Sequence, residues 1–217
     1  MKRSNIKYHL LSSILAFLIL SLTSSSIPVI AEEESESRPV RDKWAVVIGI
    51  DQFKDKTIPP LRYSAKDAQD FARFLVEKGN FKKDHVKVLL NDQATERNIL
   101  NTLGDDWLPK RALPEDLIVI FVSSHGSPRE LDRRGANYLI AHDTQKDELY
   151  TTAIKLEDLG PDIQERTQCE RVVLLLDACN SGAARAGGKG LHRNQNFDVA
   201  EISEKAGNGL VVISSSS

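Results

Sequence analysis

Apolar runs of strand length recur along this chain and are separated by longer amphipathic segments. The runs are rich in Val, Ile and Leu and lie at residues 43–50, 86–90, 117–123, 171–177 and 209–214. Nearly continuous apolar runs with many β-branched residues are typical of strands that are buried on both faces of a sheet. The sequence therefore predicts five long strands.

Amphipathic helices are expected between the strands. Apolar residues repeat at helical spacing from Ala65 to Val76, with Ser64 as the expected N-cap and Asp67 in the first turn. A second helix is expected from Thr95 to near Leu108, a third over 156–166, and a short strand over 137–141. Alternating strands and helices predict an α/β fold with a mostly parallel sheet and helices on both faces.

The N-terminal residues 1–31 have the layout of a secretory signal peptide. Basic residues precede an apolar stretch over 10–22, and small residues follow up to Ala31, the expected cleavage site. The apolar stretch is shorter than the about 20 residues that a bilayer-spanning helix needs. We therefore expect export to the periplasm or the extracellular space, with no stable membrane span after cleavage. An uncleaved membrane anchor is the alternative.

Residues 32–42 are predicted to form a flexible acidic leader, and residues 43–217 one domain. The whole chain has 29 Lys and Arg against 31 Asp and Glu, a net charge of −2. Removal of the signal peptide, which holds three basic residues and no acidic one, makes the charge more negative. This balance argues against a nucleic-acid-binding surface.

Two of the predicted strands run into short polar motifs. Residues 123–126 are Ser-Ser-His-Gly, and residues 177–182 are Asp-Ala-Cys-Asn-Ser-Gly. Because ligands bind beyond the carboxyl ends of the strands in such sheets, we expect His125 and Cys179 at one edge. An imidazole and a thiol at the same edge are the minimal equipment for a cysteine nucleophile.

These two motifs resemble those of the caspase-like cysteine peptidases, most closely the bacterial metacaspase-like proteins known as orthocaspases. His125 precedes Cys179 by 54 residues, and caspases have about 50 residues between the two. The resemblance covers Lys43 to the C-terminus and implies a caspase-like three-layer sandwich. Caspase-like domains normally continue with a further strand, so we expect the catalytic domain 43–217 to be truncated at its C-terminus.

The resemblance implies a cysteine endopeptidase that works through a Cys-His dyad and an acyl-enzyme. Cys179 is the expected nucleophile and His125 the expected acid and base. The family's oxyanion hole corresponds here to the backbone N–H groups of Gly126 and Cys179. The alternative is a catalytically silent caspase-like module that serves in binding or regulation.

The resemblance also implies a preference for Arg or Lys before the cleaved bond. Metacaspase-like enzymes form their substrate-binding pocket at the positions of Asp177, Asp67 and Ser123. Grouped carboxylates demand a cation, which is the physical reason for a basic preference. Stabilisation of a helix N-terminus by Asp67 and turn capping by Asp177 are the alternatives.

No cofactor or metal ion is expected. Some metacaspases need calcium, but the loop residues Asp132, Asp143 and Asp147 lack the spacing of an EF-hand, so a solvated acidic loop is the favoured interpretation. The expected partners are protein or peptide substrates. Self-cleavage is a hypothesis for the connection 183–196, at Arg185, Lys189 and Arg193. Cys169 is expected to be packed in the core.

Overall fold

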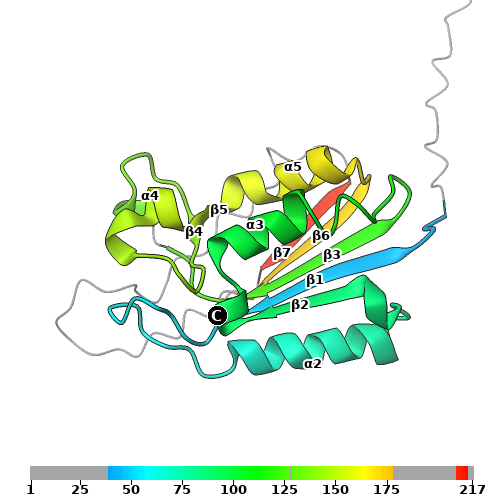
Figure 1. Cartoon of the computed structure of the whole chain (residues 1–217). Helices are drawn as coiled ribbons and strands as arrows, with labels where there is room; N and C mark the ends of the chain where they lie inside the picture. Colours follow the sequence, from blue (N-terminus) through cyan, green and yellow to red (C-terminus); the bar gives the residue numbers. More distant parts are fainter. Residues whose placement is uncertain (1–38, 128, 178–208, 215–217) are drawn as a thin grey trace, which may run out of the picture. The chain divides into compact units, whose positions relative to one another are not determined.

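The computed structural model describes residues 39–127, 129–177 and 209–214. The predicted signal peptide, Cys179 and the self-cleavage sites Arg185, Lys189 and Arg193 lie outside these residues. Five parallel strands form the main sheet in the order β2-β1-β3-β6-β7 (Figure 1). The strands are β1 (Lys43–Gly49), β2 (Val86–Leu90), β3 (Leu117–Ser123), β6 (Arg171–Asp177) and β7 (Leu210–Ser214). The five predicted strands are confirmed.

Helices cover both faces of this sheet. Helix α2 (Ser64–Glu77) lies on one face, and α3 (Glu96–Gly104) and α5 (Leu156–Thr167) lie on the other (Figure 1). In β1, Val46 and Ile48 belong to the core that also holds residues of α3 and α5, whereas Ala45 and Val47 belong to the core beneath α2. Burial on both faces explains the absence of polar alternation in the strands. The predicted α/β fold, a mostly parallel sheet with helices on both faces, is confirmed (Figure 1).

The N-termini of the first two predicted helices differ in how they are capped. Thr95 caps α3 as predicted, because its Oγ1 accepts a hydrogen bond of 3.2 Å from the amide of Asn98. The N-cap position of α2 is held by Tyr63, whose side chain makes no capping bond, so the prediction of Ser64 is wrong. Asp51, at the end of β1, supplies the cap instead, since its carboxylate accepts the amide of Ala65 at 3.0 Å.

Helix α3 ends at Gly104, earlier than the predicted end near Leu108. The amides of Asp105 and Asp106 both donate to the carbonyl of Asn101, which closes the last helical turn. The amide of Leu108 then bonds to the carbonyl of Thr102, so the chain folds back over the helix end. The apolar residues beyond Gly104 are thus buried by a turn that helical spacing does not distinguish from helix.

A small antiparallel pair lies beside the main sheet. It consists of β4 (Tyr138–Leu139) and β5 (Ile154–Lys155), with the short helix α4 (Leu149–Thr152) between them. The predicted strand over 137–141 is therefore present but only two residues long, and β5 and α4 were not predicted. No helix within the described ranges is long and apolar enough to span a bilayer.

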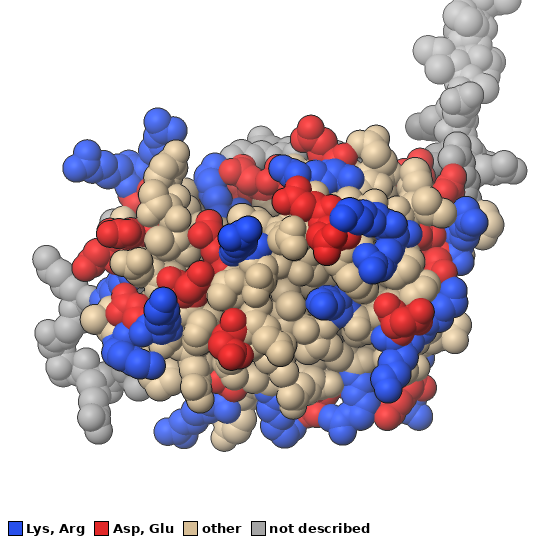
Figure 2. Space-filling view, viewed as in Figure 1, with Lys and Arg blue, Asp and Glu red and all other residues tan. Residues whose placement is uncertain are grey.

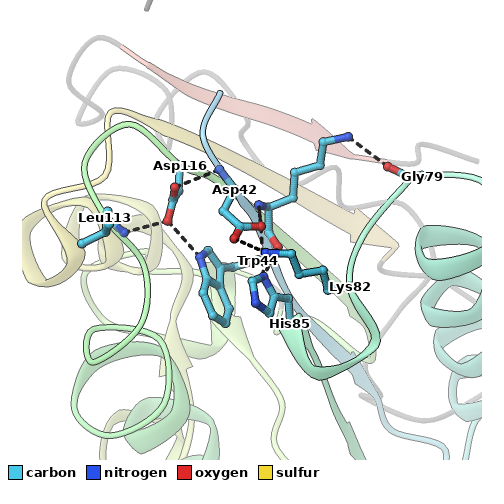
Figure 3. Close-up of polar contacts among 8 residues, drawn as sticks. Asp42, Trp44, Gly79, Lys82, His85, Leu113 and Asp116 are labelled. Atoms are coloured by element: carbon cyan, nitrogen blue, oxygen red, sulfur yellow. Dashed lines mark hydrogen bonds and ion pairs between the residues drawn. The ribbon is translucent and has the colours of Figure 1, made fainter. Parts of the chain in front are cut away.

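A polar cluster closes the amino edge of the sheet, the end at which the parallel strands begin (Figure 3). Trp44 stacks on His85 with ring centroids 3.6 Å apart and an angle of 8° between the planes. The indole N–H of Trp44 donates to Asp116 at 2.9 Å, and the same buried carboxylate accepts the amides of Asp42 at 3.0 Å and Leu113 at 2.9 Å. The first strand is thereby fixed where it enters the domain.

Candidate active site

Strands β3 and β6 end level with each other at the carboxyl edge of the sheet. Ser123 and Asp177, their last residues, are partners in the strand register. Ser123 is fully buried, and its hydroxyl donates to the Asp177 carboxylate over 3.4 Å. The structure therefore brings together two of the three residues predicted to bind the substrate.

Asp67, the third residue of the predicted pocket, lies in the first turn of α2. This turn packs against the end of β1 at Gly49, where an added Cβ would lie 2.5 Å from the carbonyl oxygen of Ser64. Gly49 is the register partner of Ser123, so α2 starts over the strand next to the Ser123–Asp177 contact. Asp67 is half-buried and is not part of that contact. This position suits both interpretations, pocket residue and helix N-terminal charge.

His125 is held in a defined orientation by a backbone carbonyl. Its Nε2 lies 2.8 Å from the carbonyl oxygen of Pro59. Since a carbonyl only accepts, Nε2 carries the proton, and Nδ1 is the basic nitrogen of the neutral ring. Burial lowers the pKa of His125 below its usual value of 6.5, against the weaker opposing effect of the bond to Pro59. The imidazole is therefore neutral at pH 7 and can accept a proton.

Phe53 contacts the face of the His125 ring, with centroids 5.3 Å apart and an angle of 30° between the planes. Phe53 and Pro59 belong to the same connection, residues 51–63, between β1 and α2. That connection is anchored by the amide of Leu61 on the carbonyl of Asp51 and by the amide of Lys54 on the carbonyl of His142, both at 2.8 Å. Positioning of His125 by residues 51–63 was missed in the sequence. Phe53, four positions beyond the end of β1, was the available signal.

Gly126 pairs with Leu139 of β4 as an isolated antiparallel bridge. The carbonyl of His125 accepts the amide of Ile140 at 3.0 Å, and the amide of Ser127 donates to the carbonyl of Tyr138 at 2.8 Å. In this pattern the bridged residues themselves exchange no hydrogen bonds, so the N–H of Gly126 points away from β4. The N–H of Gly126 therefore takes no part in the pairing with β4, while the hydrogen bonds of His125 and Ser127 hold the segment in place.

Cys169 is unsuited to the role of nucleophile. It is 2% exposed, and its Sγ lies 3.0 Å from the carbonyl oxygen of Asp116 at the amino edge of the sheet. Burial raises the pKa of the Cys169 thiol, which disfavours the thiolate. The prediction that Cys169 is packed in the core is confirmed, and His125 lies at the opposite edge.

Two of the acidic loop residues, Asp132 and Asp143, serve local structure. The Asp132 carboxylate accepts the amides of Arg134 at 2.8 Å and Ala136 at 3.1 Å, and Asp143 accepts the amide of Glu96 at 2.8 Å, at the start of α3. Among the residues that the structure describes, no group of three or more His, Cys, Asp or Glu side chains is placed to hold a metal ion.

Comparisons with known proteins relate the chain to a peptidase family. The Caspase domain family matches residues 42–217. Metacaspase-1 of Eremothecium gossypii is 27% identical over 169 residues, covering 70% of this chain and 34% of that protein. Metacaspase-1 of Yarrowia lipolytica is 31% identical over 157 residues, covering 65% and 32%. The chain thus spans about a third of the length of these curated relatives. The solved structure of pro-sf-caspase-1 aligns with 75% of this chain and 55% of that chain, at 15% identity and a TM-score of 0.47.

Proposed function

Because the chain belongs to the caspase domain family, we propose that it is a cysteine endopeptidase that cleaves after Arg or Lys, with Cys179 as nucleophile and His125 as acid and base. The observation that carries the proposal is the level ending of β3 and β6 at Ser123 and Asp177. His125 and Cys179 each follow these ends by two residues, a reach of about 7 Å for an extended chain. Two neighbouring strand ends can therefore present the imidazole and the thiol to one peptide bond.

The neutral His125 starts the proposed reaction. Its Nδ1 takes the proton of the Cys179 thiol, and the thiolate sulfur forms a bond to the carbonyl carbon of the substrate. The imidazolium then gives the proton to the leaving amine as the C–N bond breaks, which leaves a thioester. His125 next takes a proton from water, whose oxygen attacks the thioester carbon and releases the acid, and the thiol is regenerated. The carbonyl of Pro59 keeps the other ring nitrogen, Nε2, protonated throughout.

The amides of Gly126 and Cys179 are proposed to stabilise the oxyanion. The support for Gly126 is that its N–H points away from β4, because the bridge to Leu139 leaves it outside the pairing. An N–H already fixed in direction stabilises developing charge without reorganisation, which is the source of its catalytic effect.

Asp177 and Asp67 are proposed to give the preference for a basic residue. The Ser123 hydroxyl on the Asp177 carboxylate holds one acceptor in place at the strand end. A guanidinium or ammonium group of a substrate would complete the contacts of a partly desolvated carboxylate, whereas an acidic side chain would be repelled.

The experiment compares the full chain with Cys179→Ala and His125→Gln on peptide libraries with each residue before the cleaved bond. We expect cleavage after Arg and Lys, and none by Cys179→Ala. Cleavage that persists in Cys179→Ala would refute the nucleophile, and a preference for Asp would refute the acidic pocket. A folded chain that binds peptides but cleaves none would support the catalytically silent module instead.

Export is proposed from the signal-peptide layout of residues 1–31, and self-cleavage from the peptidase chemistry. N-terminal sequencing of the native protein should start near Glu32, and an intact Met1 on cytoplasmic protein would refute export. Mass spectrometry should show cuts after Arg185, Lys189 or Arg193 in the active chain but not in Cys179→Ala. Since thiol and imidazole need no Lewis acid, a chelator should leave the activity unchanged, and loss of activity restored by calcium would refute this.

A further inference from the structure

A groove lies between α3 and α5, on the face of the sheet opposite α2. Its volume is about 360 Å³, and its floor is apolar. The floor residues Leu103, Ile154, Leu159 and Ile163 are each at most 4% exposed, whereas Leu100 on the α3 rim is 42% exposed. An exposed Leu beside an apolar floor is the geometry that accepts an apolar side chain from another polypeptide.

Acidic residues dominate the rim of this groove. Glu96 and Asp105 line it from the two ends of α3, and Asp158 and Asp162 line it from α5, against the two basic residues Lys155 and Arg166. Figure 2 shows side chains of both signs over this part of the surface. The rim therefore holds more carboxylates than cations.

Both cations of the rim already have partners. Lys155 Nζ lies 3.1 Å from the carboxylate of Asp158 and 3.0 Å from that of Glu157. Arg166 Nη1 lies 3.1 Å from the carboxylate of Asp105 and 3.3 Å from the carbonyl oxygen of Gly104. These contacts leave no rim cation to pair with Glu96 or Asp162.

Glu96 and Asp162 form no ion pair with any residue that the structure describes. Burial, and then the charge of Asp143, raises the pKa of Glu96. Burial, and then the charge of Asp158, raises the pKa of Asp162 more than Arg166 lowers it. Both carboxylates therefore lie in surroundings that are short of positive charge, which a cation bound beside them would supply.

We propose that the α3–α5 groove is a docking site for a polypeptide segment of a partner protein that carries a Lys or Arg next to an apolar side chain. The apolar side chain packs on Leu100 and the floor, and the cation pairs with Glu96 and Asp162. Charge complementarity selects this partner, because the groove combines an apolar floor with two carboxylates that pair with no cation in the part of the chain that the structure describes. The proposal is independent of the peptidase activity.

The test uses the full chain carrying Cys179→Ala, so that a peptide probe cannot be cleaved at that residue. The probe is a short fluorescent peptide of alternating Leu and Lys, and its binding is measured by fluorescence anisotropy. We expect the double variant Glu96→Gln with Asp162→Asn to weaken binding about fivefold. The single variant Leu100→Ser should weaken binding by a similar factor. A fivefold change is about 1 kcal/mol, because a tenfold change corresponds to 1.4 kcal/mol. These positions are at the surface, so the variants are expected to fold.

The matched control removes two exposed acidic charges elsewhere, Glu77→Gln with Asp84→Asn, and should bind as the parent does. Equal weakening by the control, or none by the groove variants, would overturn the proposal. It would also be overturned if a probe with Ser in place of Leu bound equally well. A dimer that dissociates on Leu100→Ser would overturn it as well, by assigning the groove to a second copy of the chain.

Discussion

The two edges of the sheet use buried polar groups in opposite ways. At the amino edge, the carboxylate of Asp116 accepts three N–H groups, from Asp42, Trp44 and Leu113. At the carboxyl edge, buried His125 bonds through Nε2 to Pro59, and its Nδ1 accepts a hydrogen bond from no residue within the described ranges. A fully satisfied buried network stabilises one conformation, whereas an unused basic nitrogen keeps the capacity to take a proton. The amino edge therefore favours stability, whereas the carboxyl edge keeps a basic nitrogen available for the proposed chemistry.

The largest expected effect is on activity, at the carboxyl edge. His125→Gln should lower kcat/KM about a thousandfold, roughly 4 kcal/mol of transition-state stabilisation, because the amide cannot take a proton. The free energy of unfolding at pH 7 should change by less than about 1 kcal/mol, since Gln can still donate to the carbonyl of Pro59. Peptidase kinetics and urea unfolding measure the two quantities. An equal fall of stability and activity would contradict the division between the edges.

The next largest effect is on stability, at the amino edge. Asp116→Ala leaves three donors without their acceptor and should lower the free energy of unfolding by about 3 kcal/mol. The kcat/KM of the folded fraction should stay unchanged, because Asp116 lies at the edge remote from His125. Urea unfolding and kinetics at low temperature measure this, with Asp84→Asn as the control for loss of an exposed carboxylate. A specific loss of kcat/KM would show that the two edges are coupled.

A smaller effect sharpens the carboxyl edge. Phe53→Leu removes part of the apolar cover of His125, so the pKa of His125 should rise toward its usual 6.5, with a stability loss of about 1–2 kcal/mol. Because the neutral ring is the proposed base, the acid limb of the pH–activity profile should move to higher pH. NMR titration of the ring in Cys179→Ala follows the pKa without activity. Phe74→Leu, at a 54% exposed position, is the control and should change neither quantity.

The strands and the two motifs could be predicted because they depend on local sequence. Continuous apolar runs fix two-sided burial, and parallel strands bring their carboxyl ends to one edge, which places Ser123 next to Asp177. Pro59 could not be predicted, because it acts through a backbone carbonyl that every residue type possesses. Likewise the cap of α2 comes from Asp51, thirteen positions before Ser64, where local sequence rules favour Ser64 itself.

Burial of Asp116 was equally beyond the sequence. Asp-Leu at positions 116–117 reads as a loop end before a strand, and only the tertiary structure brings Trp44 to the carboxylate. Long-range polar contacts of this kind carry no periodic signal. The groove between α3 and α5 could not be predicted either. The apolar pattern within each helix predicts its buried face, but not which charged residues of the two helices line one groove.

The smallest expected effect concerns the pH dependence of the amino edge. Burial alone would raise the pKa of Asp42, but hydrogen bonds from Lys82 and from the amide of Lys43, with the charge of His85, hold it below 3.8. A carboxyl group whose pKa is lower in the folded state stabilises that state above its unfolded pKa, and this contribution is lost as pH falls through the folded pKa. Lys82 Nζ lies 2.6 Å and His85 Nδ1 lies 3.1 Å from the carboxylate oxygens of Asp42 (Figure 3).

Asp42→Asn should therefore lower the free energy of unfolding by less than about 1 kcal/mol near pH 6, because Lys82 is mostly exposed and its charge is screened. The difference between the variant and the parent should vanish as pH falls well below 3.8, and it should shrink with added salt at pH 6. Urea unfolding across pH measures both trends, with Asp84→Asn as the control. A difference that persists at the lowest pH would mean that Asp42 acts through shape and amide contacts.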